Sequence, residues 1–255
     1  MKIKFAEDFD EDLFDNQETD EFDYFLSRGI IAAKGPVLKQ GKEASVYYCP
    51  GTEPSASPVA LKIYKDIGTR SFKAVSKYLE GRLEEAGMSR RDRMHLMSSP
   101  RDLHCFWIQS EFHNMQLLYE QGLPVPRPLA ANGMALAMEM IMEGEEPAPR
   151  LKDARIPKED LPRLQKTLLT AIEKMLSLDL IHGDLSCYNI LYEQRRPVII
   201  DFPQMINARY HSEGKTMLER DIRNVLIFCK TQDAQGKAWR MAERLWKNYN
   251  GCNFF

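Results

Sequence analysis

The first regular pattern along the chain is an alternation of apolar and polar positions that begins at residue 36. PVLKQGKEASVYYC (36–49) predicts a strand, a turn and a second strand, and VALKIYK (59–65) predicts a third strand. Asn132-Gly133 stands between two apolar runs, which is the strongest short-range indication of a β-hairpin. The N-terminal part of the chain is therefore expected to be rich in strands.

Apolar residues at helical spacing predict one long helix in this part and several helices after it. Residues 104–122 end at Gly122, which can adopt the left-handed backbone of a C-cap. Residues 160–180 are amphipathic, with Asp160 as the expected N-cap. Residues 66–103 are expected to be irregular or weakly helical, and mobile in their later part. The other predicted elements are strands at 189–193 and 197–201 and helices at 216–230 and 233–249.

This order of elements predicts an α+β protein of two lobes. A small N-terminal lobe with a β-sheet and one long helix is expected over residues 31–144, and a compact, mostly helical lobe over 145–255. A polar connector that contains prolines (143–160) marks the boundary between them. Residues 1–30 are expected to form an acidic arm, because residues 7–23 hold ten acidic residues and no Lys or Arg. A solvated tail is expected for this run, with an arm that docks on its own domain or on a basic partner as the alternative.

Composition narrows the possible partners and surroundings. The net charge of −2 argues against a protein that coats nucleic acid or an anionic membrane, and no nucleic-acid-binding motif is present. Charged residues interrupt every apolar stretch well short of the ~20 residues that span a bilayer. The five cysteines form no CxxC pair, which favours reduced thiols. A cytoplasmic protein without membrane contact is expected.

The segment LIHGDLSCYNILYEQRRPVIIDF (180–202) carries the strongest chemical pattern. Phosphoryl transfer requires that the attacking hydroxyl is positioned and that the phosphate charge is neutralised. Asp184 can orient the hydroxyl and accept its proton, while Asn189 and Asp201 offer the hard oxygen ligands that Mg²⁺ prefers. His182 is expected to hold the loop rather than act as a base. A surface turn followed by a hairpin is the alternative, but the complete pattern favours phosphotransfer.

The predicted strands supply a possible nucleotide site. Lys62 lies in the middle of a strand, where a lysine needs an anionic partner, and Glu111 in the following helix is the candidate. Alternatively, Lys62 is an outward-facing edge residue. The turn of residues 40–46 is expected to cover phosphates, with a plain hairpin turn as the alternative. Its candidate residues are Gly41, Lys42, Glu43, Ala44, Ser45 and Val46.

The segment MEMI (138–141) precedes the predicted boundary. The backbone of Glu139 and Ile141 is expected to bind the edge of an adenine, with Met138 behind it. Methionines in such a run are more often part of a core, and this reading stays open.

Taken together, these segments resemble the RIO kinases, nearest to the first subgroup of that family. The resemblance rests on GKEASVY, ALKIYK, the W-x-x-x-EF-x-N pattern, HGDLSxYNIL and IIDFPQ, with LERDIRNV (218–225) further on. It implies a protein-kinase-like fold without a full activation segment, and an atypical serine/threonine kinase or ATPase that uses ATP and Mg²⁺. By the same analogy Lys62 pairs with Glu111, Asp184 is the catalytic base, and Asn189 and Asp201 bind the metal. Expected partners are a protein substrate or the chain itself, and components of ribosome assembly.

Two other functions are compatible with these motifs. A small-molecule kinase of the aminoglycoside or choline type also uses HGDxxxxN and a later Asp, but only 54 residues follow Asp201 here, which leaves little room for a substrate pocket. A slow ATPase that docks on ribosomal or other proteins would keep the same residues. Ser89, Ser98 and Ser99 are candidate autophosphorylation sites, and the resemblance adds transient phosphorylation of Asp201.

Overall fold

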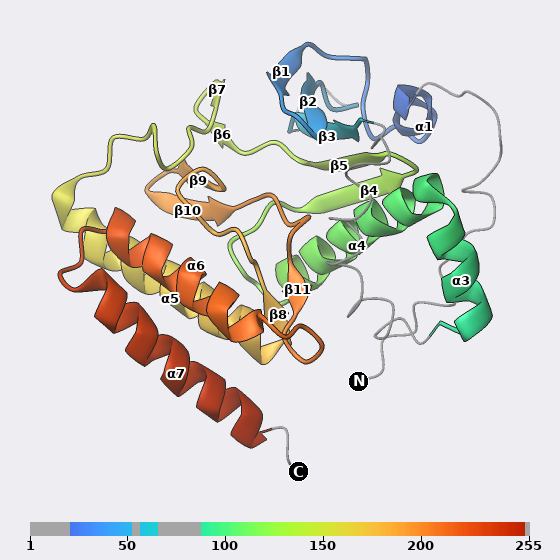
Figure 1. The fold of residues 1–255 in the computed structure, drawn as a ribbon. Coiled ribbons are helices and arrows are strands. Elements are labelled where there is room, and N and C mark those ends of the chain that lie inside the picture. Colours follow the sequence, from blue (N-terminus) through green and yellow to red (C-terminus); the bar gives the residue numbers. More distant parts are fainter. Residues whose placement is uncertain (1–20, 53–56, 66–87, 253–255) are drawn as a thin grey trace. The chain divides into compact units, whose positions relative to one another are not determined.

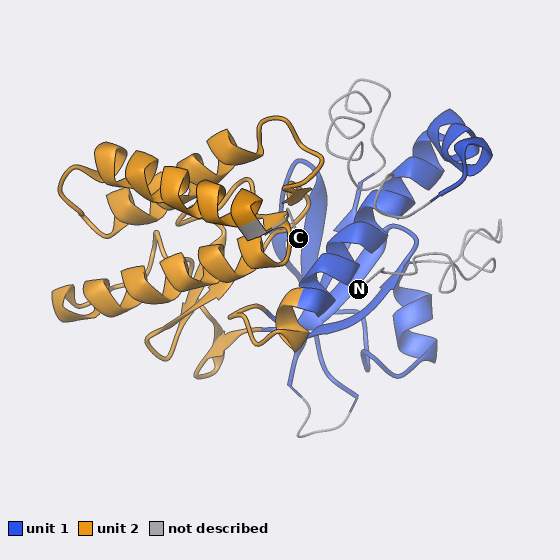
Figure 2. Ribbon diagram, turned by 90° about the horizontal axis from the view of Figure 1, so that it is seen from below, with its two compact units in different colours: residues 1–117, 126–140 blue, residues 118–125, 141–255 orange. Residues whose placement is uncertain are grey.

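The computed structural model describes residues 21–52, 57–65 and 88–252 (Figure 1). It divides the chain into two compact units, Met1–Leu117 with Pro126–Met140 and Leu118–Val125 with Ile141–Phe255 (Figure 2). The chain crosses from unit 1 to unit 2 for the last time after Met140. The sequence predicted this boundary after residue 144. Most of the acidic arm expected over 1–30, and the first part of the segment expected to be irregular, lie outside the described residues.

Unit 1 is built on a five-stranded sheet in which all neighbours are antiparallel. The hairpin predicted at Asn132-Gly133 is confirmed, and Gly133 has the positive φ of 51° that suits such a tight turn. The strands predicted within 36–49 and over 59–65 are confirmed as well. In spatial order the strands are β1 (Val37–Gln40), β2 (Ala44–Cys49), β3 (Val59–Tyr64), β5 (Ala135–Glu139) and β4 (Pro128–Asn132).

The central strand β3 is buried on both faces, and its side chains alternate between them. Val59 and Leu61 belong to an apolar cluster that includes Phe22 and Phe25 of helix α1 (Glu21–Ser27). Lys62 lies at an alternate position and therefore faces the opposite side of the sheet. The last three residues of the acidic run, 21–23, begin α1 and bury Phe22. For these three residues the alternative of an arm that docks on its own domain is correct, and the solvated tail is wrong.

Two consecutive helices follow in the N-terminal unit. Helix α3 (Arg90–Ser98) lies in the segment expected to be irregular or weakly helical, and the Ser89 hydroxyl caps it by accepting from the Asp92 N–H at 3.2 Å. Helix α4 (Pro100–Glu120) starts four residues before its predicted start. Proline is favoured in the first turn of a helix, and the Ser99 hydroxyl accepts from the Asp102 N–H there at 3.2 Å. The predicted left-handed Gly122 is confirmed, with φ of 70°.

Unit 2 contains the helices α5 (Leu161–Ser177), α6 (Gly214–Phe228) and α7 (Ala234–Cys252), within three residues of the predicted bounds. Helix α5 buries one apolar face, made by Leu164, Leu168, Ala171, Ile172, Met175 and Leu176. Three two-stranded sheets complete the unit: β6 (Met142–Glu143) with β7 (Glu146–Pro147), β8 (Leu180–Ile181) with β11 (Ile206–Asn207), and β9 (Ile190–Glu193) with β10 (Arg196–Ile199). Among the described residues no helix has the length and apolarity needed to cross a membrane.

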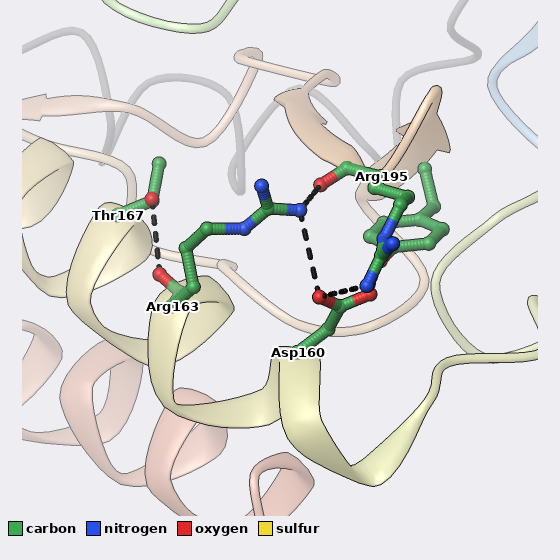
Figure 3. A network of polar contacts seen from close by, with 5 residues as sticks. Asp160, Arg163, Thr167 and Arg195 are labelled. Carbon is green, nitrogen blue, oxygen red and sulfur yellow. Dashed lines mark hydrogen bonds and ion pairs between the residues drawn. The ribbon is translucent and has the colours of Figure 1, made fainter.

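Asp160 occupies the N-cap position of α5, as predicted, but its side chain does not cap the helix. Asp160 ends a 3-10 turn (Lys158–Asp160), and its side chain makes no capping hydrogen bond. Instead, Arg195 from the β9–β10 turn donates to both carboxylate oxygens, at 2.7 and 2.6 Å (Figure 3). Arg163 in the first turn of α5 donates in addition to the Arg195 carbonyl at 2.8 Å. These bonds lower the pKa of Asp160 and tie the hairpin turn to the start of α5.

Candidate active site

Asp184 and Asn189 are in direct contact within the HGD loop, residues 182–189. The Asn189 amide nitrogen donates to the Asp184 main-chain carbonyl and to its carboxylate Oδ2, each at 2.9 Å. Both partners are acceptors, so the nitrogen of the amide must face Asp184 and the Asn189 Oδ1 must point away from it. The Asn189 amide oxygen, a hard donor of the kind that Mg²⁺ binds, is therefore turned away from the Asp184 carboxylate.

Asp201 follows β10 and is brought to the same loop by backbone contacts of its neighbour Ile200. The Ile200 N–H donates to the Asn189 carbonyl at 3.0 Å, and the Ile200 carbonyl accepts from the His182 Nε2 at 3.2 Å. Asp201 itself has a φ of 73°, in the left-handed region that Asp tolerates better than most residues. Asp184, Asn189 and Asp201 therefore belong to one cluster in unit 2.

His182 holds this cluster together, as the sequence predicted. Its Nδ1 accepts from the Asp184 N–H at 3.3 Å while its Nε2 faces the Ile200 carbonyl, which fixes the tautomer with the proton on Nε2. Burial lowers the pKa of His182, although Asp201 and Asp184 lie near enough to act in the other direction. A neutral ring with both nitrogens engaged suits a positioning role.

Asp221 in α6 binds the backbone of the HGD loop. No role was predicted for it from the sequence. Its two carboxylate oxygens accept from the N–H groups of Gly183 and Leu185, at 2.8 and 3.0 Å. Asn224 on the same helix donates to the Leu185 carbonyl at 2.9 Å. Burial raises the pKa of Asp221 to about 7, against the lowering effect of the two amides. The segment LERDIRNV contained this residue, but its contact is visible only in the fold.

Gly183 explains the middle position of HGD. It has a φ of 79°, and a Cβ atom there would lie 2.7 Å from the Gln204 carbonyl oxygen and from the Met217 methyl group. A side chain would therefore require backbone movement in the segment after Asp201. The close approach of Gln204 depends on glycine at this position.

In unit 1, the expected pair of Lys62 and Glu111 is present. Lys62 Nζ donates to Glu111 Oε1 at 2.9 Å, and the two residues are only 8% and 2% exposed. Tyr64 lies two positions after Lys62, on the same face of β3, and its hydroxyl donates to Glu111 Oε2. Burial, followed by the Glu111 charge, raises the pKa of Tyr64, so the phenol stays a donor. Sequence reasoning missed Tyr64, although its spacing from Lys62 was visible.

The turn of residues 40–46 is a hairpin between β1 and β2. The Gly41 N–H donates to the Ala44 carbonyl at 2.8 Å. This amide was predicted to face a phosphate, but it is engaged within the turn. Ala44, Ser45 and Val46 belong to β2 and pair with β3. Gly41, Lys42 and Glu43 are the turn residues outside both strands.

Backbone hydrogen bonds also engage two of the main-chain atoms predicted to contact adenine. The Glu139 N–H donates to the Arg127 carbonyl at 2.8 Å, so this donor is already engaged. The Ile141 carbonyl accepts from the Ala148 N–H at 2.9 Å, which leaves the Ile141 N–H. Met138, half-buried in β5, is paired with Ala60.

The predicted site residues therefore form separate groups within the two units. Unit 1 holds the Lys62–Glu111 pair, the turn and Met138–Glu139, and unit 2 holds Ile141, Asp184, Asn189 and Asp201. In the described parts of the chain no three His, Cys, Asp or Glu side chains are grouped to hold a metal by themselves.

A five-stranded sheet with a buried Lys–Glu pair, joined to a helical unit with an Asp–Asn loop and a strand that leads into Asp, defines a fold of the protein-kinase class. The family model of the RIO domain matches residues 45–240. The chain belongs to the RIO family of atypical protein kinases.

Named relatives agree with this assignment. The chain is 29% identical to the RIO-type serine/threonine-protein kinase Rio1 of Haloferax volcanii, over 92% of this chain and 77% of the relative. It is 33% identical to the serine/threonine-protein kinase RIO1 of Chaetomium thermophilum, over 80% of this chain but only 40% of that longer protein. These names favour a protein kinase over the small-molecule kinases that share HGDxxxxN.

The fold is also similar to a solved structure, the Rio2 kinase–ADP/Mg²⁺–phosphoaspartate complex from Chaetomium thermophilum. The TM-score is 0.62 at 23% identity, covering 88% of this chain and 65% of the other. At this identity the likeness shows the shared fold.

Proposed function

We propose that this chain transfers the γ-phosphate of ATP, with Mg²⁺, to a serine or threonine hydroxyl of a protein, its own hydroxyls included. The observation that carries the proposal is the contact of Asn189 with Asp184. This contact holds the Asp184 carboxylate in place. It also turns the Asn189 amide oxygen away from that carboxylate, within the cluster that contains Asp201. This arrangement suits a hydroxyl acceptor next to a metal-bound phosphate.

Within unit 2, Asp184 would orient the attacking hydroxyl and accept its proton. Asn189 Oδ1 and the Asp201 carboxylate are hard oxygen donors that fit Mg²⁺, which is usually held by few protein ligands and by substrate phosphates. The bound ion would supply neutralisation of the phosphate charge. His182 and Asp221 keep the loop in place through the bonds described above and touch no reacting atom in this scheme.

Within unit 1, Lys62 would bind phosphate oxygens while Glu111 and Tyr64 fix its position. The turn amides of Lys42 and Glu43 are proposed to cover the phosphates, with the remaining turn residues shaping that cover. The Glu139 carbonyl and the Ile141 N–H are proposed to bind the adenine edge.

A second function, ATP hydrolysis through phosphorylated Asp201, is supported by the phosphoaspartate named for the related Rio2 structure. An Asp201 oxygen would attack the γ-phosphorus, the bond to the bridging oxygen would break, and ADP would leave. Water would then hydrolyse the acyl phosphate to the free carboxylate and inorganic phosphate. Docking on ribosome-assembly components and a cytoplasmic location are further parts of this proposal.

The test uses the purified full chain with γ-labelled ATP, alone, with generic proteins, and with aminoglycosides or choline. We expect self-labelling and ATP hydrolysis that require Mg²⁺. Label that resists hydroxylamine reports Ser or Thr, and label that hydroxylamine removes reports a carboxyl phosphate. Rapid labelling of a small alcohol, without labelling of protein or hydrolysis of ATP, would contradict both proposed functions. The variant Asp184→Asn is the control for contaminating kinases.

A further inference from the structure

Helix α3 carries an exposed face that is both basic and rich in methionine. Arg90, Met94 and Met97 follow helical spacing, and the two methionines are 67% and 47% exposed. Arg91 and His95 lie on the adjoining stripe. A groove of about 700 Å³ adjoins this face at Arg91, Met94 and His95, and Arg90 and Met97 lie outside its lining. The other residues that line it are Met88, Leu96 and two acidic residues, Asp92, which accepts from the Ser89 hydroxyl at 2.6 Å, and Asp102. Large exposed apolar side chains beside charges are typical of a surface that binds a partner.

The chain itself contains a segment of matching chemistry. Residues 7–20 hold eight acidic residues and no Lys or Arg, and they place Phe9, Leu13 and Phe14 between the charges. Acidic side chains suit the arginines of α3, and the three apolar side chains suit its exposed methionines. No other stretch of the sequence combines these features.

The arm joins the described structure at Glu21, the first residue of α1. Phe22 and Phe25 bury α1 against the sheet, so the position of Glu21 is set by the core of unit 1. Glu21 lies near enough to Arg101, at the start of α4, for that guanidinium to favour its ionised form, although burial raises the pKa of Glu21 overall. Only Ser99 and Pro100 separate Arg101 from the end of α3.

The arm is long enough to cover the helix. Nine residues of α3 span about 14 Å at 1.5 Å per residue. Fourteen residues span about 20 Å as a helix and more than twice that when extended. The extended arm is about three times as long as α3.

We propose that residues 7–20 dock on the basic, methionine-rich face of α3 in the same chain. Acidic side chains pair with Arg90 and Arg91, and Phe9, Leu13 and Phe14 cover Met94 and Met97. The contact links the N-terminal arm to the segment that leads into α4, the helix of Glu111. This proposal does not depend on which phosphoryl acceptor the protein uses.

The first arm of the test is zero-length cross-linking of the full chain by a carbodiimide, which joins carboxylates to lysine. Arg91→Lys keeps the charge and provides the amine. We expect a cross-link between residues 7–20 and Lys at position 91 within a monomer. The matched control neutralises all eight acidic residues of the arm, and it should lose the cross-link. Its substitutions are E7Q, D8N, D10N, E11Q, D12N, D15N, E18Q and D20N.

The second arm measures oxidation of Met94 and Met97 by dilute hydrogen peroxide, with Met241 of α7 as internal reference. A docked-to-free ratio of about two slows oxidation about threefold relative to the neutralised arm. The difference should vanish at 1 M NaCl, where the Debye length is about 3 Å, while Met241 stays unchanged.

Three results would overturn the proposal. Cross-linked dimers would assign the face to the arm of a second copy. Equal oxidation of Met94 and Met97 in both proteins, without a cross-link, would show that the arm does not cover α3. Binding of single-stranded RNA that is lost in R90E/R91E and unaffected by the neutralised arm would assign the face to a phosphate polymer instead.

Discussion

Replacing Asp221 by Asn tests how the HGD loop is held. Asn keeps the shape of the side chain, but one of its two polar atoms becomes an N–H₂ group. Above pH 7, where Asp221 is ionised and accepts with both oxygens, that group would face the N–H of either Gly183 or Leu185, so one buried donor loses its acceptor. Such a loss costs about 1–3 kcal/mol of unfolding free energy.

The pKa of Asp221 makes the free energy of unfolding depend on pH. The sign of this dependence is opposite to that of an ordinary paired carboxylate. Burial raises the pKa from 3.8 to about 7 in the folded protein. The folded chain therefore binds more protons than the unfolded chain between these values, and the stabilisation is complete below pH 3.8 and lost as pH rises through 7. These two pKa values give about 2–3 kcal/mol at pH 5 and almost nothing at pH 8.

The assay is urea unfolding of wild type and Asp221→Asn at pH 5, 6, 7 and 8, followed by circular dichroism. The stability difference between the two proteins should shrink by about 2–3 kcal/mol from pH 5 to pH 8. Asp160→Asn is the matched control. Arg195 lowers the pKa of Asp160, so its contribution is lost only at more acidic pH and its difference from wild type should be constant. A constant difference for Asp221→Asn as well would refute the raised pKa.

Other predictions follow from single contacts. Gly183→Ala should lower stability by about 1–3 kcal/mol in thermal unfolding, because its Cβ would strike the Gln204 carbonyl and its φ is positive; an unchanged melting temperature would contradict this. Tyr64→Phe should lower stability by about 1–3 kcal/mol, because Glu111 Oε2 loses a buried donor; the same melting assay decides. Asp201→Asn should weaken Mg²⁺-ATP binding in calorimetry, and unchanged magnesium dependence would remove Asp201 from the metal site.

Local turn chemistry and side-chain periodicity accounted for much of the fold. Asn132-Gly133 and Gly122 were found because each needs a backbone conformation that few residues adopt. Strand β3 followed from its alternation. The requirement that a lysine inside a sheet has an anionic partner predicted a pair for Lys62, whereas the choice of Glu111 rested on the family resemblance as much as on the pattern.

Long-range contacts account for what was missed. Asp160 had the sequence context of an N-cap, but Arg195, 35 positions later, engages its carboxylate in the fold. Asp221 lies 38 positions from Gly183, and nothing local reveals that contact. One indication was present: Leu218, Asp221, Ile222 and Val225 share the helical spacing of a buried face, and a carboxylate on such a face requires donors.

The measurement that tests the central claim most directly is phosphoryl transfer by Asp184→Asn from γ-labelled ATP, with ATP affinity measured on the same preparation by calorimetry. The account predicts nearly unchanged affinity and a rate of transfer that falls by roughly two or more orders of magnitude, the usual scale for a positioned base. Transfer by the variant at the wild-type rate would contradict the account.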